Sequence, residues 1–186
     1  MLTRVAFACL LALTGPGWAD CPPAPDISAR MDALLAEVQQ VGSEQAARGV
    51  SARMWEEWVK APDLRAQELL DEGMQRRQAF DLTGAVIAFD ALIAYCPRYA
   101  EGYNQRAFAN FIREDYEAAL VDLDRAIELR PRHVAAIAGR GLTLIALDRV
   151  ADGQAAIRAA MALNPWLSER RFLDLAVDPE DRAIDL

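Results

Sequence analysis

The chain has 186 residues, of which 53% are apolar and 26% are charged, and its formal net charge is −8 at pH 7. This composition is typical of a globular domain with a real core and excludes an intrinsically disordered chain. The acidic balance, without any run of Lys and Arg, argues against nucleic acid and anionic lipid surfaces as partners, because both polyanions would be repelled.

Residues 1–19 have the features of a secretory signal peptide. Arg4 precedes an apolar run from Val5 to Leu13, and a Gly-Pro-Gly break leads to small residues at Gly17 and Ala19. The apolar run is shorter than the ~20 residues that a membrane-spanning helix needs. We therefore expect cleavage after Ala19, a periplasmic or secreted protein, and no integral membrane segment after cleavage.

Two cysteines remain once the signal peptide, with Cys9, is removed. An even number of cysteines in an oxidising compartment favours a disulfide between Cys21 and Cys96. Closing such a long loop would stabilise the fold by about 4 to 5 kcal/mol on the chain-entropy model. The alternative is that Cys96 is a small residue at a helix end and Cys21 is a free thiol.

Residues 20–65 predict a pair of helices. The first helix follows a capping residue at Asp26, and a turn at Gly42-Ser43 separates it from a second helix that runs up to Pro62. Trp55 and Trp58 share one face of the second helix. They fit a ligand-binding pair, but we expect them to plug the exposed end of the unit that follows. Whether this helix pair is itself a repeat is open.

A strict period begins at residue 66. Pro97, Pro131 and Pro165 follow one another at intervals of 34 residues, which divides the chain into units at 66–99, 100–133 and 134–167. Small residues recur at positions 8 and 20 of the units and a large apolar residue recurs at position 24: Gly73, Ala107 and Gly141; Ala85, Ala119 and Gly153; Phe89, Leu123 and Ile157. Each unit therefore predicts two closely packed helices that a proline ends, and the units must stack to bury their faces.

This spacing resembles the tetratricopeptide repeat (TPR), and the middle unit matches it best. The matching residues of that unit are Tyr103, Tyr116, Ala119, Leu123, Ala126 and Pro131. The chain is also similar to small exported TPR proteins of proteobacteria in the order of its segments, which are the signal peptide, "MWEEW", "AEGYNQRA" and "PRHVAAIAGRG". The resemblance implies an all-α, right-handed α-solenoid of three helix-turn-helix repeats. Residues 168–186 would add a capping helix, with Phe172 and Leu173 packed inward, and an acidic tail.

The sequence contains no catalytic motif, so we do not expect an enzyme. The single histidine, His133, follows Pro131 in a connector and is interpreted as a surface turn residue. Two groups of acidic residues lack the ligand alternation of a calcium loop and are interpreted as solvated charge. One group is Asp122 and Asp124, and the other, in the tail, is Asp178, Glu180 and Asp181. No metal site and no cofactor are expected.

Arg106 and Arg140 share position 7 of successive units. Either they form a ladder that grips a partner carboxylate, or, as we favour, their stems line the helix interface while their guanidinium groups pair with acids of the preceding unit. The TPR positions that clamp an acidic peptide C-terminus hold other residues in this chain, so that clamp is absent: Leu70, Met74, Gln105, Ala135 and Gly139.

The resemblance also assigns a concave groove. Its lining positions select Leu70, Met74, Arg77, Gln78, Glu101, Asn104, Phe108, Phe111, Ile112, Leu142 and Ile145. We expect a protein or peptide partner there, with Phe108 and Phe111 as anchors and Asn104 holding a backbone amide. The expected function is an exported scaffold or adaptor for an envelope protein. The alternatives are a broad-specificity periplasmic chaperone or assembly factor, and an accessory that stabilises a catalytic subunit. The partner and the oligomeric state stay open.

Overall fold

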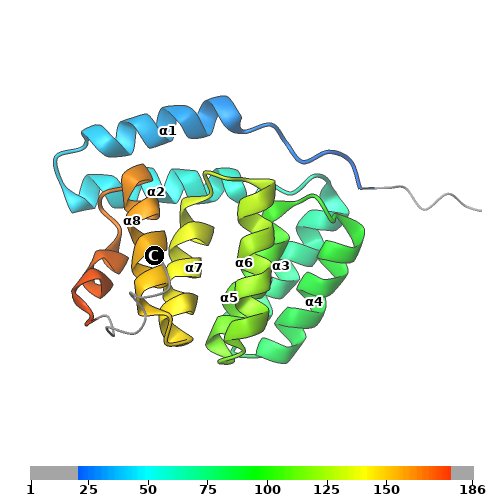
Figure 1. Cartoon of the computed structure of the whole chain (residues 1–186). Coiled ribbons are helices and arrows are strands. Elements are labelled where there is room, and N and C mark those ends of the chain that lie inside the picture. The colour runs from blue at the N-terminus through cyan, green and yellow to red at the C-terminus, as the bar shows by residue number, and fades with distance from the viewer. Residues whose placement is uncertain (1–20, 177–186) are drawn as a thin grey trace, which may run out of the picture.

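The computed structural model describes residues 21–176, and these form eight α-helices and one short 3₁₀ helix. The elements are α1 (Ser28–Gln40), α2 (Glu44–Trp58), α3 (Leu64–Gln78), α4 (Leu82–Tyr95), α5 (Ala100–Ile112), α6 (Tyr116–Leu129), α7 (Val134–Ala146), α8 (Val150–Leu163) and η1 (Ser168–Asp174). Helices α3 to α8 form three successive pairs, and α1 and α2 run across one end of them (Figure 1). The expected signal peptide and most of the expected acidic tail lie outside the described residues.

The turns inside the three helix pairs have the same backbone conformation. Phe80, Glu114 and Asp148 stand at position 15 of successive units and have φ angles of 60°, 63° and 61°. A left-handed residue at this point ends the first helix and reverses the chain. In the first two pairs, the next residue caps the second helix, because Asp81 and Asp115 accept hydrogen bonds from the backbone N–H groups of Gly84 and Ala118, three residues later. The repeat is therefore regular down to single backbone angles.

Small residues let the two helices of a pair approach closely. A Cβ atom added at Gly73 would lie 2.3 Å from the Phe89 ring, and one at Gly153 would lie 2.6 Å from the carbonyl oxygen of Gly141. Such contacts are far inside van der Waals distance, so a larger side chain would push the helices apart. Phe89 and Ile157 at position 24 are fully buried and fill the remaining space. The small and large positions of the period are thus explained by packing.

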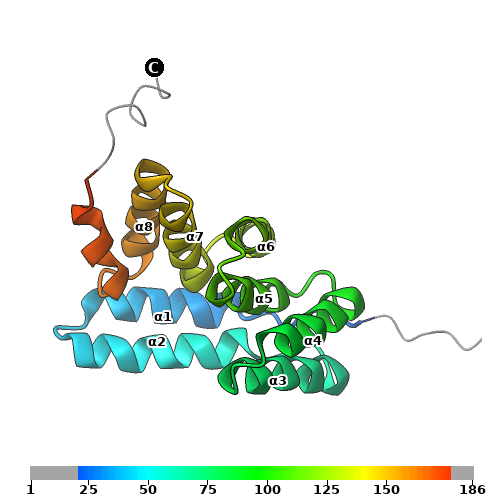
Figure 2. The same ribbon diagram turned by 90° about the horizontal axis from the view of Figure 1, so that it is seen from below.

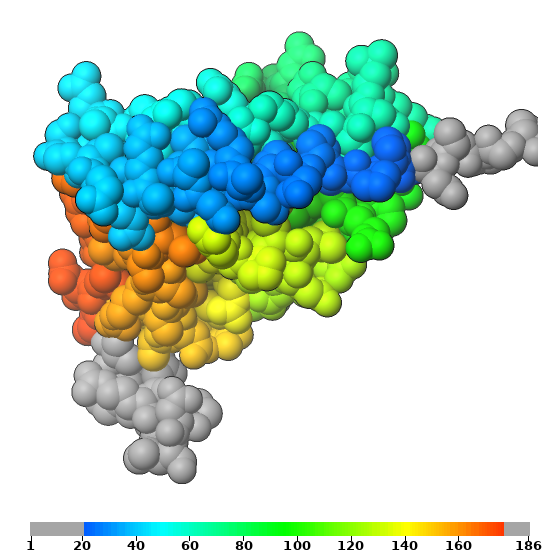
Figure 3. Space-filling view, turned by 90° about the horizontal axis from the view of Figure 1, so that it is seen from above, coloured from blue at the N-terminus to red at the C-terminus, as the bar shows by residue number. Residues whose placement is uncertain are grey.

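The α1–α2 hairpin packs against the last repeat, not only against the first. Its apolar residues form one core cluster with Val134, Ile137 and Ala138 of α7 and Ala160 of α8. Figure 2 shows the repeats curving round so that α7 and α8 return to α1, and Figure 3 shows the hairpin surface in contact with the surface of the third repeat. The prediction that the tryptophans plug the end of the first repeat was therefore wrong. The amphipathic face of α1 needs an apolar surface, and the curved array presents one at its far end.

Polar contacts across this junction join residues far apart in the sequence. The Gln39 side-chain amide donates to the carbonyl oxygen of Ala162 at 2.8 Å, and Arg132 pairs with Asp32 at 2.6 Å. The Tyr99 hydroxyl donates to the carbonyl oxygen of Trp58 at 2.8 Å. Burial raises the pKa of the Tyr99 phenol, so this donor stays protonated across the physiological range. The hairpin is held by apolar and polar contacts together.

A disulfide joins the segment before α1 to the end of the first repeat. Cys21 is bonded to Cys96, and their Cα atoms are 5.2 Å apart. Cys96 is buried in the apolar cluster of the first repeat. The bond therefore attaches the start of the hairpin to a packed part of the solenoid.

The segment after α8 differs from the expected capping helix. Only the short η1 forms there, with Phe172 and Leu173 half-buried. The Gln154 side-chain amide of α8 donates to the carbonyl oxygens of Phe172, Leu173 and Leu175 at 3.2, 3.2 and 2.9 Å. This bonding holds the backbone carbonyls against α8 and replaces part of the bonding of a regular helix. Within residues 21–176, no helix is both long enough and apolar enough to cross a membrane.

Candidate functional site

The concave side of the repeats contains a groove of about 340 Å³. It is lined by residues of α2, α3, α5, α6 and α7 and by Leu167 and Glu169 around the start of η1. The lining residues are Trp55, Arg77, Asn104, Gln105, Ala107, Phe108, Phe111, Leu123, Ala135, Ala138, Gly139, Leu142, Thr143, Leu167 and Glu169. Most of this surface is apolar, and a few polar groups converge on it, as in many ligand and peptide sites.

Five residues that the resemblance assigned to the groove do line it: Arg77, Asn104, Phe108, Phe111 and Leu142. Phe108 keeps 50% of its surface exposed, and Phe111 is held edge-on against Tyr116 with ring centroids 5.3 Å apart. The Asn104 side chain is 7% exposed and donates its amide to Glu101, so its oxygen is the atom left for a partner. The site thus offers two aromatic rings beside one polar acceptor.

The other assigned residues do not line the groove. Leu70 is fully buried in the cluster of the first repeat, against which Val59 and Ala61 of the connector from α2 to α3 also pack, and Met74 is half-buried against the same cluster. Ile145 lies against Gly153 between α7 and α8. Gln78 is exposed outside the groove, and Ile112 is half-buried outside it. The assignments of Leu70 and Ile145 as groove residues were wrong, since each fills an interface that only the packed repeats create.

Glu101 was also expected in the groove and instead lies beneath it. Its carboxylate is 1% exposed and accepts hydrogen bonds from Asn104 at 3.0 Å and from the Gln105 amide. It also lies 2.8 Å from Nε2 of His133. Nδ1 of His133 accepts the N–H of Ala136 in the first turn of α7, so the hydrogen of a neutral ring belongs on Nε2 and points to Glu101.

His133 is fully buried, so its interpretation as a surface turn residue was wrong. The ring of Trp58 stacks on it, with the two centroids 4.2 Å apart and the planes 16° from parallel. The connector that contains His133 would be exposed in an isolated repeat. It is covered here because α2 crosses the ends of the repeats, and a buried ring then needs its hydrogen bonds satisfied internally.

The groove also contains residues that the periodicity did not select. Trp55 comes from α2 and is 36% exposed, and Leu167 and Glu169 come from the segment around the start of η1. Their positions depend on how the hairpin and the C-terminal segment fold back over the repeats. The three-residue spacing of Trp55 and Trp58 was the one signal in the sequence for these additional groove residues. In the structure Trp55 lines the groove, whereas Trp58 docks the hairpin.

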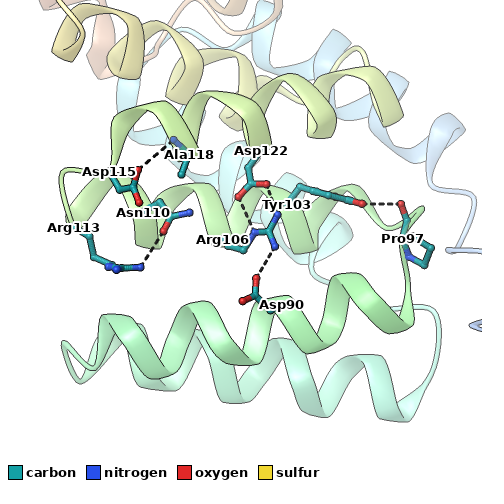
Figure 4. Close-up of polar contacts among 9 residues, drawn as sticks. All are labelled: Asp90, Pro97, Tyr103, Arg106, Asn110, Arg113, Asp115, Ala118 and Asp122. Carbon is teal, nitrogen blue, oxygen red and sulfur yellow. Dashed lines mark hydrogen bonds and ion pairs between the residues drawn. The ribbon is translucent and has the colours of Figure 1, made fainter.

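On the outer side, Arg106 joins two repeats through acidic residues (Figure 4). Its guanidinium binds Asp122 with two hydrogen bonds of 2.8 and 2.6 Å and Asp90 of the preceding unit at 2.6 Å. Arg140 pairs with Asp124 of its preceding unit at 2.6 Å. The hydrogen bonds to Asp122 raise the pKa of Arg106. The arginines at position 7 therefore form ion pairs between repeats, as expected. The interpretation of Asp122 as solvated charge was wrong, because Asp122 is only 3% exposed.

Comparison with solved structures places this architecture among TPR domains. The TPR2B domain of yeast Sti1, in a complex with an Hsp70 peptide, is 28% identical, has a TM-score of 0.56, and is matched over 60% of this chain and 92% of that chain. The first TPR domain of Spaghetti (RPAP3), bound to the HSP90 peptide SRMEEVD, is 20% identical with a TM-score of 0.58 over 59% of this chain and 87% of that one. The fold is a TPR-type α-solenoid.

The similar sequences are TPR proteins as well. A Tetratricopeptide repeat protein 36 homolog of Nematostella vectensis is 40% identical over 74 residues, which is 40% of this chain and 41% of the relative. A TPR repeat-containing protein of Rhizobium etli is 25% identical over 151 residues, 76% of this chain and 74% of that protein. The chain thus spans about two fifths of the length of the animal relative. No protein-family model matches the chain. The names of the relatives and the structural likeness together support the TPR assignment.

Proposed function

We propose that the chain is an exported scaffold or adaptor that binds a peptide or helix of another envelope protein in the groove. The observation that carries the proposal is the half-exposed Phe108, which stands beside Phe111 in an apolar concavity. A groove that only contacted water would gain nothing from displaying these rings. Aromatic residues in a concave site are instead typical anchors for a partner.

The similar TPR structures support a role in protein interaction. The Sti1 and Spaghetti domains are described with bound Hsp70 and HSP90 peptides, so a fold of this kind accepts a peptide. The proposal that the chain is exported rests on the signal-like residues 1–19 and on the disulfide, since disulfides persist chiefly in oxidising compartments.

The function is tested by capturing partners from an envelope extract with the purified chain and with a Phe108→Ser, Phe111→Ser double variant. The expected result is one dominant partner retained by the wild type and lost by the variant, with helicity and melting temperature nearly unchanged. The matched control is Ile87→Ser, Val121→Ser, because both side chains are exposed, at 63% and 69%, and lie outside the groove. Retention of the partner by the groove variant at wild-type affinity would place the binding surface elsewhere.

A further inference from the structure

The groove contains a cation that has no acidic partner within the described residues. The Arg77 guanidinium is half-buried, lies 4.4 Å from the centroid of the Phe108 ring, and donates one hydrogen bond to the side-chain oxygen of Gln105. A guanidinium has five N–H donors in a fixed planar fork. Its other N–H donors have no hydrogen-bond partner among residues 21–176, and Arg77 is one of the groove-lining residues.

The preceding residue shows what an ordinary pairing looks like on the same helix. Arg76 pairs with Glu72 and with Asp81, both at 2.8 Å, and it does not line the groove. Arg77 is more buried than a solvated surface arginine and has no such partner among residues 21–176. Burying a charge without pairing it is costly, which is why the surroundings of an unpaired buried cation suggest a ligand.

Glu101, whose charge acts on Arg77, does not complete the pairing. Gln105 stands between Arg77 and Glu101, accepting from the first through its oxygen and donating to the second through its nitrogen. Glu101 is already bonded by Asn104 and lies against His133. Burial lowers the pKa of Arg77, because desolvation disfavours the charged form, and the charge of Glu101 opposes that shift. An arginine is not deprotonated in proteins, so the guanidinium is a partly desolvated cation in the groove lining.

We propose, on the basis of the function proposed above, that the groove binds a partner segment with one Asp or Glu carboxylate beside apolar side chains. Arg77 binds the carboxylate through its planar fork, and the apolar side chains lie over Phe108, Phe111 and Leu142. Carboxylate and guanidinium match in geometry and form strong, charge-assisted hydrogen bonds. The apolar neighbours of the acid exclude water and strengthen the pairing.

The charges around the groove also limit the partner to a single acid. Glu169 is the other charged residue among the groove-lining residues, and it repels further carboxylates on its side. The net charge of −8 disfavours an acidic run as a whole. The positions that would clamp an acidic C-terminus in other TPR domains hold Leu70, Met74, Gln105, Ala135 and Gly139 in this chain, and Leu70 is fully buried. The partner is therefore apolar with one internal acid.

The probe for this inference is a displayed library of random decapeptides, selected on the full chain and on the Phe108→Ser, Phe111→Ser variant as background. We expect the peptides enriched by the wild type to contain one Asp or Glu next to apolar residues. Changing that acid to its amide in a synthetic copy should weaken binding to the wild type about tenfold. The same change should alter binding to an Arg77→Gln variant by less than about twofold, as a double-mutant cycle requires of a direct pair.

Arg76→Gln is the matched control, because it removes a neighbouring positive charge that faces away from the groove; it should keep the tenfold preference. Arg77→Lys keeps the charge but not the fork and should keep a reduced preference. Circular dichroism of each variant verifies that it is folded. An equal preference in wild type and Arg77→Gln overturns the assignment of Arg77.

The outcomes separate the inference from the proposed function. If the wild type selects no peptides above the groove-variant background, peptide binding fails and the inference fails with it. If it selects peptides without any enrichment in acids, the groove binds peptides but the single-acid partner is wrong. If removing residues 177–186 raises the affinity for the selected peptides about tenfold or more, and the excised segment competes with them, the occupant is the chain's own tail and not another protein.

Discussion

The three repeats and the N-terminal hairpin are held to the molecule in different ways. The arginine ion pairs between repeats recur at one sequence spacing, since Arg106 with Asp90 and Arg140 with Asp124 each join residues 16 positions apart. Hairpin contacts have no such spacing. Gln39 reaches Ala162 across 123 residues, and Asn164 reaches Ser51 across 113. A solenoid stacks by nearest neighbours, whereas the hairpin depends on the curvature of the whole array.

This difference implies that the hairpin is the part most easily separated from the rest. Its docking requires that all three repeats already be folded and stacked, because its buried apolar partners come from α7 and α8. The repeats, in contrast, form most of their interfaces without it. The comparison predicts a hierarchy of effects in which a change inside a repeat also releases the hairpin, and a change at the hairpin leaves the repeats folded.

The largest effect is expected from Leu123→Asp. Leu123 is 4% exposed in the cluster of the middle repeat, so the substitution leaves an unpaired charge between α5, α6 and α7. Both the repeats and the hairpin should lose their cooperative melting, followed by circular dichroism. The matched control is Val121→Asp, two residues away on the same helix and 69% exposed, which should melt close to the wild type. An unchanged melting curve for Leu123→Asp would contradict the packed repeat.

A smaller and more selective effect is expected from Trp58→Ala. It removes the ring that stacks on His133 and should destabilise the docked hairpin by about 3 to 5 kcal/mol. Hydrogen exchange followed by mass spectrometry should then show faster exchange in α1 and α2 than in α4 to α6. Trp55→Ala is the matched control, because Trp55 lines the open groove and is more exposed. Uniformly faster exchange along the chain would mean that hairpin and repeats unfold as one unit.

The smallest effect is expected from Arg132→Gln. The side chains of Arg132 and its partner Asp32 are 53% and 61% exposed, and exposed pairs contribute at most about 1 kcal/mol. A double-mutant cycle with Asp32→Asn, measured by urea unfolding, should give a coupling that salt weakens. A coupling as large as the loss in Trp58→Ala would show that charge, and not apolar packing, docks the hairpin.

Five of the eleven residues assigned from the sequence line the groove, and particular residues show why the others do not. Phe108 and Phe111 lie on α5, in the middle of the array, where a neighbouring repeat stands on each side and the period specifies orientation. Leu70 lies in the first repeat and is buried in a cluster against which the connector from α2 also packs. Glu101 and His133 are 32 positions apart, and their pairing requires that the start of α7 lie against α5 and that Trp58 cover the imidazole ring. The positions of side chains at the ends of the array therefore depend on contacts with elements outside the repeats, which the 34-residue period does not describe.

The sequence by itself determined the repeat: the 34-residue interval and the small residues at Gly73 and Gly153 follow from the local packing of two helices. Only the tertiary structure decided that the hairpin closes onto the last repeat, that Trp58 covers His133, and that Arg77 lies in the groove without an acidic partner within the described residues. The physical reason is that contacts between neighbouring repeats recur with the period of the sequence. The curvature of the whole array depends on all of its interfaces together, and this curvature determines which elements come into contact at its two ends.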